Sequence, residues 1–106
     1  MNDSQFPWLI LVPKRENITE IHQLSTTDQQ QLIRESSFIA EKLAGLFQAD
    51  KMNIAALGNM VPQLHIHHVV RYKTDKAWPA PIWGKFDAVV YTDKELEVVL
   101  NMLKKL

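Results

Sequence analysis

The chain has 106 residues, 46% hydrophobic and 23% charged, which fits one globular domain spanning residues 1–106, and its apolar runs fall far short of the ~20 residues of a membrane span. Twelve basic and twelve acidic residues give a formal net charge of zero, which removes the usual electrostatic basis for binding nucleic acid or a membrane surface. We therefore expect a small molecule or a protein as the partner. The absence of cysteine excludes a disulfide framework and a thiolate zinc site. Residues 1–5 do not resemble a secretory signal, so we expect the protein to reside in the cytoplasm.

The first predicted strand covers residues 7–12. Its segment Trp8-Leu9-Ile10-Leu11-Val12 is rich in strand-forming residues and ends at Pro13, which cannot donate a hydrogen bond to a sheet. We expect this strand to be mostly buried.

A long amphipathic helix is predicted over residues 27–48. Thr26 stands three residues before Gln29, the spacing of a capping box at a helix start. Apolar or small residues then follow at steps of three and four and predict a buried stripe: Leu32, Ser36, Ile39, Leu43 and Leu46.

Two further strands are predicted at residues 52–57 and 63–72, separated by a turn at Gly58-Asn59, and we expect them to be neighbours in an antiparallel sheet. Alternation in the second strand divides its side chains between the two faces of the sheet. One face carries Leu64, Ile66, His68 and Val70, and the other carries Gln63, His65, His67, Val69 and Arg71.

Residues 73–85 contain Pro79, Pro81 and Gly84 and show no periodic pattern, which predicts a long loop that packs its aromatic side chains. The capping box Thr92 to Glu95 and an apolar stripe after it predict a C-terminal helix over residues 93–105. The expected fold class is therefore α+β, an antiparallel sheet packed with one long helix and a C-terminal helix.

Gln63, His65 and His67 form a polar row on one strand face, and this row has three interpretations. The first is a merely solvated face. The second is a metal site, although no Asp, Glu or Cys follows at ligand spacing. The third is covalent catalysis, in which one imidazole attacks phosphorus while its neighbours hold its tautomer and bind the phosphate oxygens.

The segment from Asn53 to Arg71, NIAALGNMVPQLHIHHVVR, resembles the signature of the histidine triad (HIT) superfamily. That signature has a strand led by Asn, a Gly-Gln turn, a Val, and His-x-His-x-His followed by two apolar residues. Upstream, FPWLILVPKR at residues 6–15 resembles the family strand that ends in Ile-Pro-Lys-Arg or Lys and then His. The resemblance covers residues 6–71.

The resemblance implies a nucleotide hydrolase or nucleotidyl transferase acting at a phosphoanhydride or phosphoramidate bond, without a metal or other cofactor. It implies that His65 is the nucleophile, that His67 contacts phosphate, and that Asn53 lines the nucleotide site, with Asn59 replacing a phosphate-contacting Gln. It also implies a homodimer, because members of the superfamily commonly join their sheets.

The chain departs from the family pattern at two histidines. Gln63 replaces the first histidine of the triad and cannot carry a proton, and Glu16 stands where another histidine usually follows the upstream strand. Little in the chain corresponds to the family strands that precede residues 7–12. The alternatives are therefore a nucleotide-binding module with little or no turnover, or a structural interaction domain whose contact surface is the aromatic loop of residues 73–86.

Several residues carry weaker signals. His68 is expected to pack against the helices rather than serve as a ligand. Trp78, Trp83 and Phe86 are expected either to cover the core or a dimer contact or to stack on a base. Arg71 and Lys73, like the pair Lys14-Arg15, either steer an anion or are solvated charges.

Overall fold

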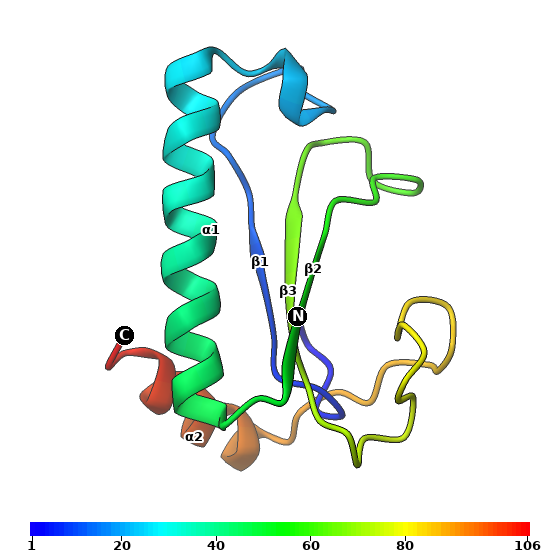
Figure 1. Cartoon of the computed structure of the whole chain (residues 1–106). Coiled ribbons are helices and arrows are strands. Elements are labelled where there is room, and N and C mark those ends of the chain that lie inside the picture. The colour runs from blue at the N-terminus through cyan, green and yellow to red at the C-terminus, as the bar shows by residue number, and fades with distance from the viewer.

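The computed structural model describes residues 1–106 and contains three strands, two α-helices and one short 3-10 helix (Figure 1). In chain order these are β1 (Trp8–Leu11), the 3-10 helix η1 (Ile21–Gln23), α1 (Thr26–Phe47), β2 (Lys51–Ala55), β3 (Ile66–Arg71) and α2 (Asp93–Leu103). The strands form one antiparallel sheet in the order β1-β3-β2. The α+β class expected from the sequence is confirmed.

Helix α1 runs along one face of the sheet (Figure 1). It buries Leu32, Ser36 and Leu43 of the stripe expected from the spacing, whereas Ile39 and Leu46 are half-buried. Leu32 joins a core cluster beneath the helix with Leu24, Leu64 and Ile66. Each fully buried Leu or Ile side chain contributes about 1.5–3 kcal/mol relative to an exposed one, so this cluster fixes the helix against β3.

The start of α1 corrects one expectation. The N-cap is Ser25, not Thr26, and its hydroxyl accepts a hydrogen bond of 3.1 Å from the backbone N–H of Asp28. Gln29 does not close a capping box, because its side-chain amide donates to the carbonyl of Leu24 at 3.0 Å. The helix therefore begins at Thr26.

Strand β1 is half-buried along its length rather than mostly buried, because it forms an edge of the sheet and has only β3 as a neighbour. It ends at Leu11, and Val12 is already exposed. The strand β2 is the other edge, so β3 is central and all six of its residues are buried.

Strand β3 begins at Ile66, three residues later than the sequence pattern suggested. The reason is the early end of β1: Leu11 pairs with Ile66, and beyond it no strand is present to pair with residues 63–65. The backbone N–H of Leu64 instead donates to the carbonyl of Ile18 at 2.9 Å. Gln63 and His65 therefore lie in the segment that leads into the strand.

Residues 72–92 contain no helix or strand, as expected of a loop rich in proline, and part of this segment packs against the sheet face opposite α1. Ala77 and Ile82 from this loop form a buried cluster with Phe6 and Val69, and Trp83 packs against it. Of the alternatives expected for Trp83, the structure therefore shows packing over the core.

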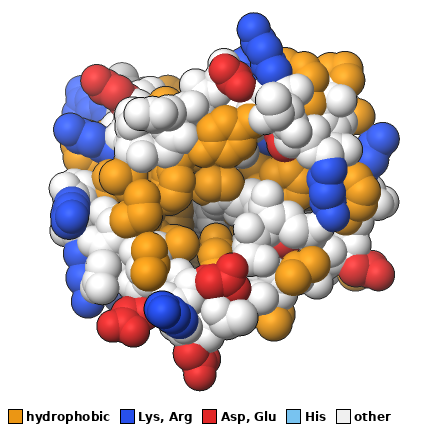
Figure 2. Space-filling view, turned by 90° about the horizontal axis from the view of Figure 1, so that it is seen from below, with side chains coloured by type: hydrophobic (Ala, Val, Ile, Leu, Met, Phe, Trp, Pro, Cys, Tyr) orange, Lys and Arg blue, Asp and Glu red, His pale blue; other side chains and the backbone are white.

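The capping box at Thr92 and Glu95 is present at the start of α2, as predicted. None of the residues of α2 is fully buried, and its apolar face borders a cavity of about 310 Å³ next to β1 and the end of α1. Figure 2 views the molecule from below and shows hydrophobic side chains gathered around a hollow on that side. Neither helix has the length and apolar character needed to cross a membrane.

Candidate functional site

The candidate site is a pair of histidines at the N-terminal end of β3. His67 is the second residue of the strand and is 7% exposed, whereas His65 precedes the strand and is half-buried. Their ring centroids are 4.9 Å apart and the rings meet edge to face at 72°. The structure thus brings together the two histidines that the sequence placed in one row.

The orientation of His65 is set by the backbone of Gln63. Nδ1 of His65 lies 2.8 Å from the carbonyl oxygen of Gln63. Because a carbonyl can only accept, Nδ1 carries the proton and donates it. The neutral ring therefore has its lone pair on Nε2, which is the form an imidazole needs to act as a nucleophile or base.

His67 has the opposite arrangement. The indole Nε1–H of Trp8 donates to Nδ1 of His67 at 3.0 Å. Since an indole N–H only donates, Nδ1 is the acceptor and the neutral ring carries its proton on Nε2. Burial lowers the pKa of His67, and the neighbouring charges of His65, His68 and the N-terminal amine lower it further.

Asn53 lies on the same sheet face as His67. It pairs across the strands with Val69, and Ala55, two residues further along β2, pairs with His67. The side-chain oxygen of Asn53 accepts a hydrogen bond of 2.7 Å from Nη1 of Arg71, so its amide N–H groups are free to donate.

Arg71 is neither an anion-steering group nor a solvated charge, which corrects both expectations. It is 1% exposed, and its guanidinium is bidentate to Asp75 at 2.8 and 3.0 Å. A further bond of 2.9 Å goes to the carbonyl of Ala80 in the loop. Hydrogen bonds from Arg71 and from three backbone N–H groups hold the pKa of Asp75 at about 2.

Gln63 and Asn59 are less closely associated with the histidine pair. The Gln63 amide donates to the carbonyl of Arg15 at 3.2 Å, which joins the segment before β3 to the turn after β1, where Glu16 is exposed. Asn59 is exposed in the loop between β2 and β3, after Gly58 with its φ of 75°. The side chain of Arg15 forms an ion pair of 2.7 Å with Asp28 of α1, while Lys14 is exposed.

His68 lies on the opposite sheet face from the pair, as the alternation predicted. It is fully buried, and its Nε2 lies 2.7 Å from the hydroxyl of Ser36 in α1. The structure contains no group of three or more His, Asp or Glu side chains arranged to hold a metal ion.

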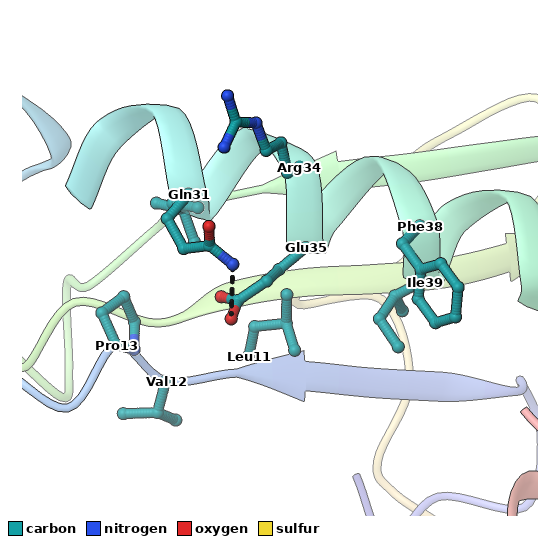
Figure 3. A pocket seen from close by; sticks show the side chains of 9 residues that line it. Leu11, Val12, Pro13, Gln31, Arg34, Glu35, Phe38 and Ile39 are labelled. Atoms are coloured by element: carbon teal, nitrogen blue, oxygen red, sulfur yellow. Dashed lines mark hydrogen bonds between the residues drawn. The ribbon is translucent and has the colours of Figure 1, made fainter. Parts of the chain in front are cut away.

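A groove larger than the cavity beside α2 lies away from the histidines, between α1 and β1 (Figure 3). Its volume is about 660 Å³, and it is lined by nine residues that include Leu11, Val12 and Phe38 but no histidine. Leu11 packs against the core cluster beneath α1, so the groove opens on the helix side of the sheet. Its one carboxylate, Glu35, accepts a hydrogen bond of 3.4 Å from the side-chain amide of Gln31. Because no histidine lines the groove, we assign the site to the histidine pair despite the groove's size.

Two contacts of the site had no clear signal in the sequence. Alternation puts Trp8 and Ile10 on one face of β1, but the partner of Trp8 depends on the register between β1 and β3, in which Ile10 lies opposite His67. The ion pair of Arg71 and Asp75 has an i, i+4 spacing that is informative only within a helix, and here it spans a turn.

Comparison with known proteins matches the part of the chain that contains the histidine pair. The model of the HIT domain family matches residues 1–74. A crystal structure of a histidine triad protein from Marinobacter aquaeolei VT8 is 52% identical, with a TM-score of 0.97, and the match covers 99% of this chain and 77% of that one. A search of curated proteins finds no significant match.

Two further solved structures are similar at 40% identity. A histidine triad protein from Sinorhizobium meliloti 1021 matches with a TM-score of 0.94 over 100% of this chain and 79% of that one. A histidine triad protein from Bradyrhizobium japonicum matches with a TM-score of 0.95 over 99% and 78% of the two chains.

Proposed function

Since the chain belongs to the histidine triad family, we propose that it is a nucleotide hydrolase or nucleotidyl transferase that acts at a phosphoanhydride or phosphoramidate bond. The observation that carries the proposal is the hydrogen bond of 2.8 Å between Nδ1 of His65 and the carbonyl of Gln63. It leaves the lone pair of His65 on Nε2, and the ring centroids of His65 and His67 are 4.9 Å apart.

In the first step, Nε2 of His65 attacks the phosphorus atom, and a nitrogen–phosphorus bond forms while the bond to the leaving group breaks. The leaving group departs with the bonding electron pair and takes a proton from solvent where it needs one, because Gln63 has none to give. Water or another acceptor then attacks phosphorus, loses a proton to solvent, and releases the imidazole. The scheme uses no metal or other cofactor.

Four side chains surround the phosphate in this proposal. His67 offers the Nε2–H that its contact with Trp8 leaves free, and Asn53 offers the amide N–H groups that Arg71 does not use. Asn59 and Gln63 contribute further amide donors when the loop before β3 meets the ligand. Neutral donors of this kind stabilise a phosphate without a buried positive charge.

The test follows AMP release from adenosine 5′-phosphoramidate and from a diadenosine polyphosphate by chromatography. The wild type should release AMP from at least one of them, His65→Ala should lose that release, and His22→Ala should keep it, because His22 is exposed in η1. Release that is equal in the wild type and His65→Ala would exclude His65 as the nucleophile.

A nucleotide-binding module without turnover is the second candidate. It is favoured by Gln63, which stands in place of the first triad histidine and whose amide is already bonded to the carbonyl of Arg15. A binding module would show a rise in melting temperature with AMP but no release of AMP from either substrate. His67→Ala should abolish that rise in both cases, since both candidates bind the phosphate at the same histidine pair.

We further propose that the protein is a homodimer joined through its sheet, as the family resemblance implies. Both edge strands, β1 and β2, have a side without a neighbouring strand in the single chain. Light scattering coupled to size-exclusion chromatography would measure the mass, and a value near the 12.3 kDa of one chain would contradict the dimer.

A further inference from the structure

Trp8 and His67 are joined by a directional contact between neighbouring strands. The indole Nε1–H of Trp8 donates to Nδ1 of His67 at 3.0 Å, and the ring centroids are 5.5 Å apart. The residue next but one in β1, Ile10, lies directly opposite His67 in the ladder. The contact is therefore fixed by the register of β1 and β3 rather than by a mobile loop.

Trp83 packs on the same imidazole without any such bond. Its ring lies 5.6 Å from that of His67 and 6.2 Å from that of Trp8, in both cases edge to face. Its own indole N–H is buried and has no hydrogen-bond partner. The two tryptophans thus enclose His67 to a similar degree, but only Trp8 acts on a particular ring nitrogen.

We propose that Trp8 is a positioning residue that holds His67 in the neutral tautomer with its proton on Nε2. This inference rests on the proposed function and adds a residue to it. The Gln63 carbonyl orients His65, and the indole N–H of Trp8 orients His67. The pair therefore presents the lone pair on Nε2 of His65 and the N–H on Nε2 of His67 from adjacent rings. A phosphate needs both, the first at phosphorus and the second at a non-bridging oxygen.

The contact also disfavours the charged form of His67. Protonation would put a hydrogen on Nδ1, where it would face the indole N–H, so the bond would be lost. The titratable groups whose charges act on His67 are His65 before the strand, His68 on the other face of β3 and the amine of Met1, and these positive charges oppose its protonation as well. From β2 the residue opposite His67 is Ala55, which carries no charge.

The tautomer can be measured without any turnover. Long-range proton–nitrogen correlation NMR of the ligand-free protein distinguishes a protonated Nε2 from a protonated Nδ1 for each histidine. The wild type should show His67 protonated at Nε2, Trp8→Phe should show a mixture of tautomers and a higher pKa of His67, and Trp83→Phe should match the wild type. A wild-type His67 protonated at Nδ1 would overturn the inference whatever the enzyme does.

The activity of the same variants tests the positioning role. We expect Trp8→Phe to lower kcat/KM about three- to tenfold, the effect of one lost hydrogen bond, and Trp83→Phe to lower it less. If Trp8→Phe does not fold, benzothienylalanine at position 8 removes the N–H and keeps the ring shape. Mixed tautomers with unchanged kcat/KM would overturn the positioning role. A wild type inactive on every nucleotide would instead remove the proposed function and leave the tautomer result standing.

Discussion

The hydroxyl of Ser36 in the middle of α1 lies 2.7 Å from Nε2 of His68 at the centre of the sheet, and both residues are buried. Nδ1 of His68 lies 3.2 Å from the carbonyl of Ile66, so Nδ1 donates and Nε2 accepts the Ser36 hydroxyl. Both ring nitrogens are satisfied inside the protein. Of the three histidines in residues 65–68, this one therefore serves the fold.

Ser36→Ala should destabilise the protein by ~1–3 kcal/mol, because it leaves Nε2 of His68 buried without a donor. Urea denaturation followed by circular dichroism measures the change in the free energy of unfolding. Ser37→Ala is the matched control, since Ser37 is exposed on the same helix and has no partner to lose. Equal stability of the two variants would show that the bond contributes nothing.

Stability should fall as the pH is lowered from neutrality through 6.5. Burial lowers the pKa values of His67 and His68 below 6.5, so the unfolded chain binds protons that the folded chain does not. This contribution is complete above pH 6.5 and is lost as the pH falls from there toward the folded pKa values. Urea midpoints at several pH values measure it, and His22→Gln should have the same profile as the wild type because His22 is exposed. Midpoints that do not change over this range would contradict the burial argument.

Asp75→Asn should destabilise the protein by ~3–5 kcal/mol, because it leaves the buried guanidinium of Arg71 without its partner charge. Asp87→Asn is a suitable control, since Asp87 is exposed and its side chain makes no hydrogen bond. A loss in Asp75→Asn no greater than in this control would mean that the ion pair does not stabilise the loop against the sheet.

The same carboxylate gives a second, separable pH effect. The pKa of Asp75 is about 2, below its ordinary value of 3.8, so it stabilises the fold fully above about pH 5 and loses this contribution as the pH falls through 3.8 toward 2. The difference corresponds to about 2 kcal/mol. Acid titration of unfolding should show this loss in the wild type and not in Asp75→Asn. A similar acid loss in both proteins would assign it to other carboxylates.

The elements of this fold could be predicted from local patterns, and the contacts of the site could not. The stripe of α1 and the inward orientation of His68 depend only on helical and strand periodicity, which the sequence carries directly. The bond from Trp8 to His67 depends on strand register, and the pairing of Arg71 with Asp75 depends on the path of a loop. The start of β3 at Ile66 differs from the predicted residue 63 because it depends on where β1 ends.

Gln63→His tests how much the glutamine in place of the first triad histidine lowers kcat/KM. The backbone carbonyl that orients His65 is unchanged by this substitution, so the nucleophile should keep its tautomer. An imidazole at position 63 can donate a proton to the leaving group, which a glutamine cannot. An amine needs that proton more than a phosphate does, because phosphate leaves as a stable anion. We therefore expect kcat/KM to rise about tenfold or more for adenosine 5′-phosphoramidate and less for a diadenosine polyphosphate.

The control for this substitution is Gln63→Asn, which is polar but equally unable to carry a proton and should keep the ratio of the two kcat/KM values. Steady-state assays on both substrates give that ratio directly. If Gln63→His raises neither value, proton donation at position 63 does not limit the reaction, and the glutamine is compatible with full activity. If it raises both equally, the new imidazole stabilises the phosphate rather than the leaving group, and the role of position 63 is electrostatic.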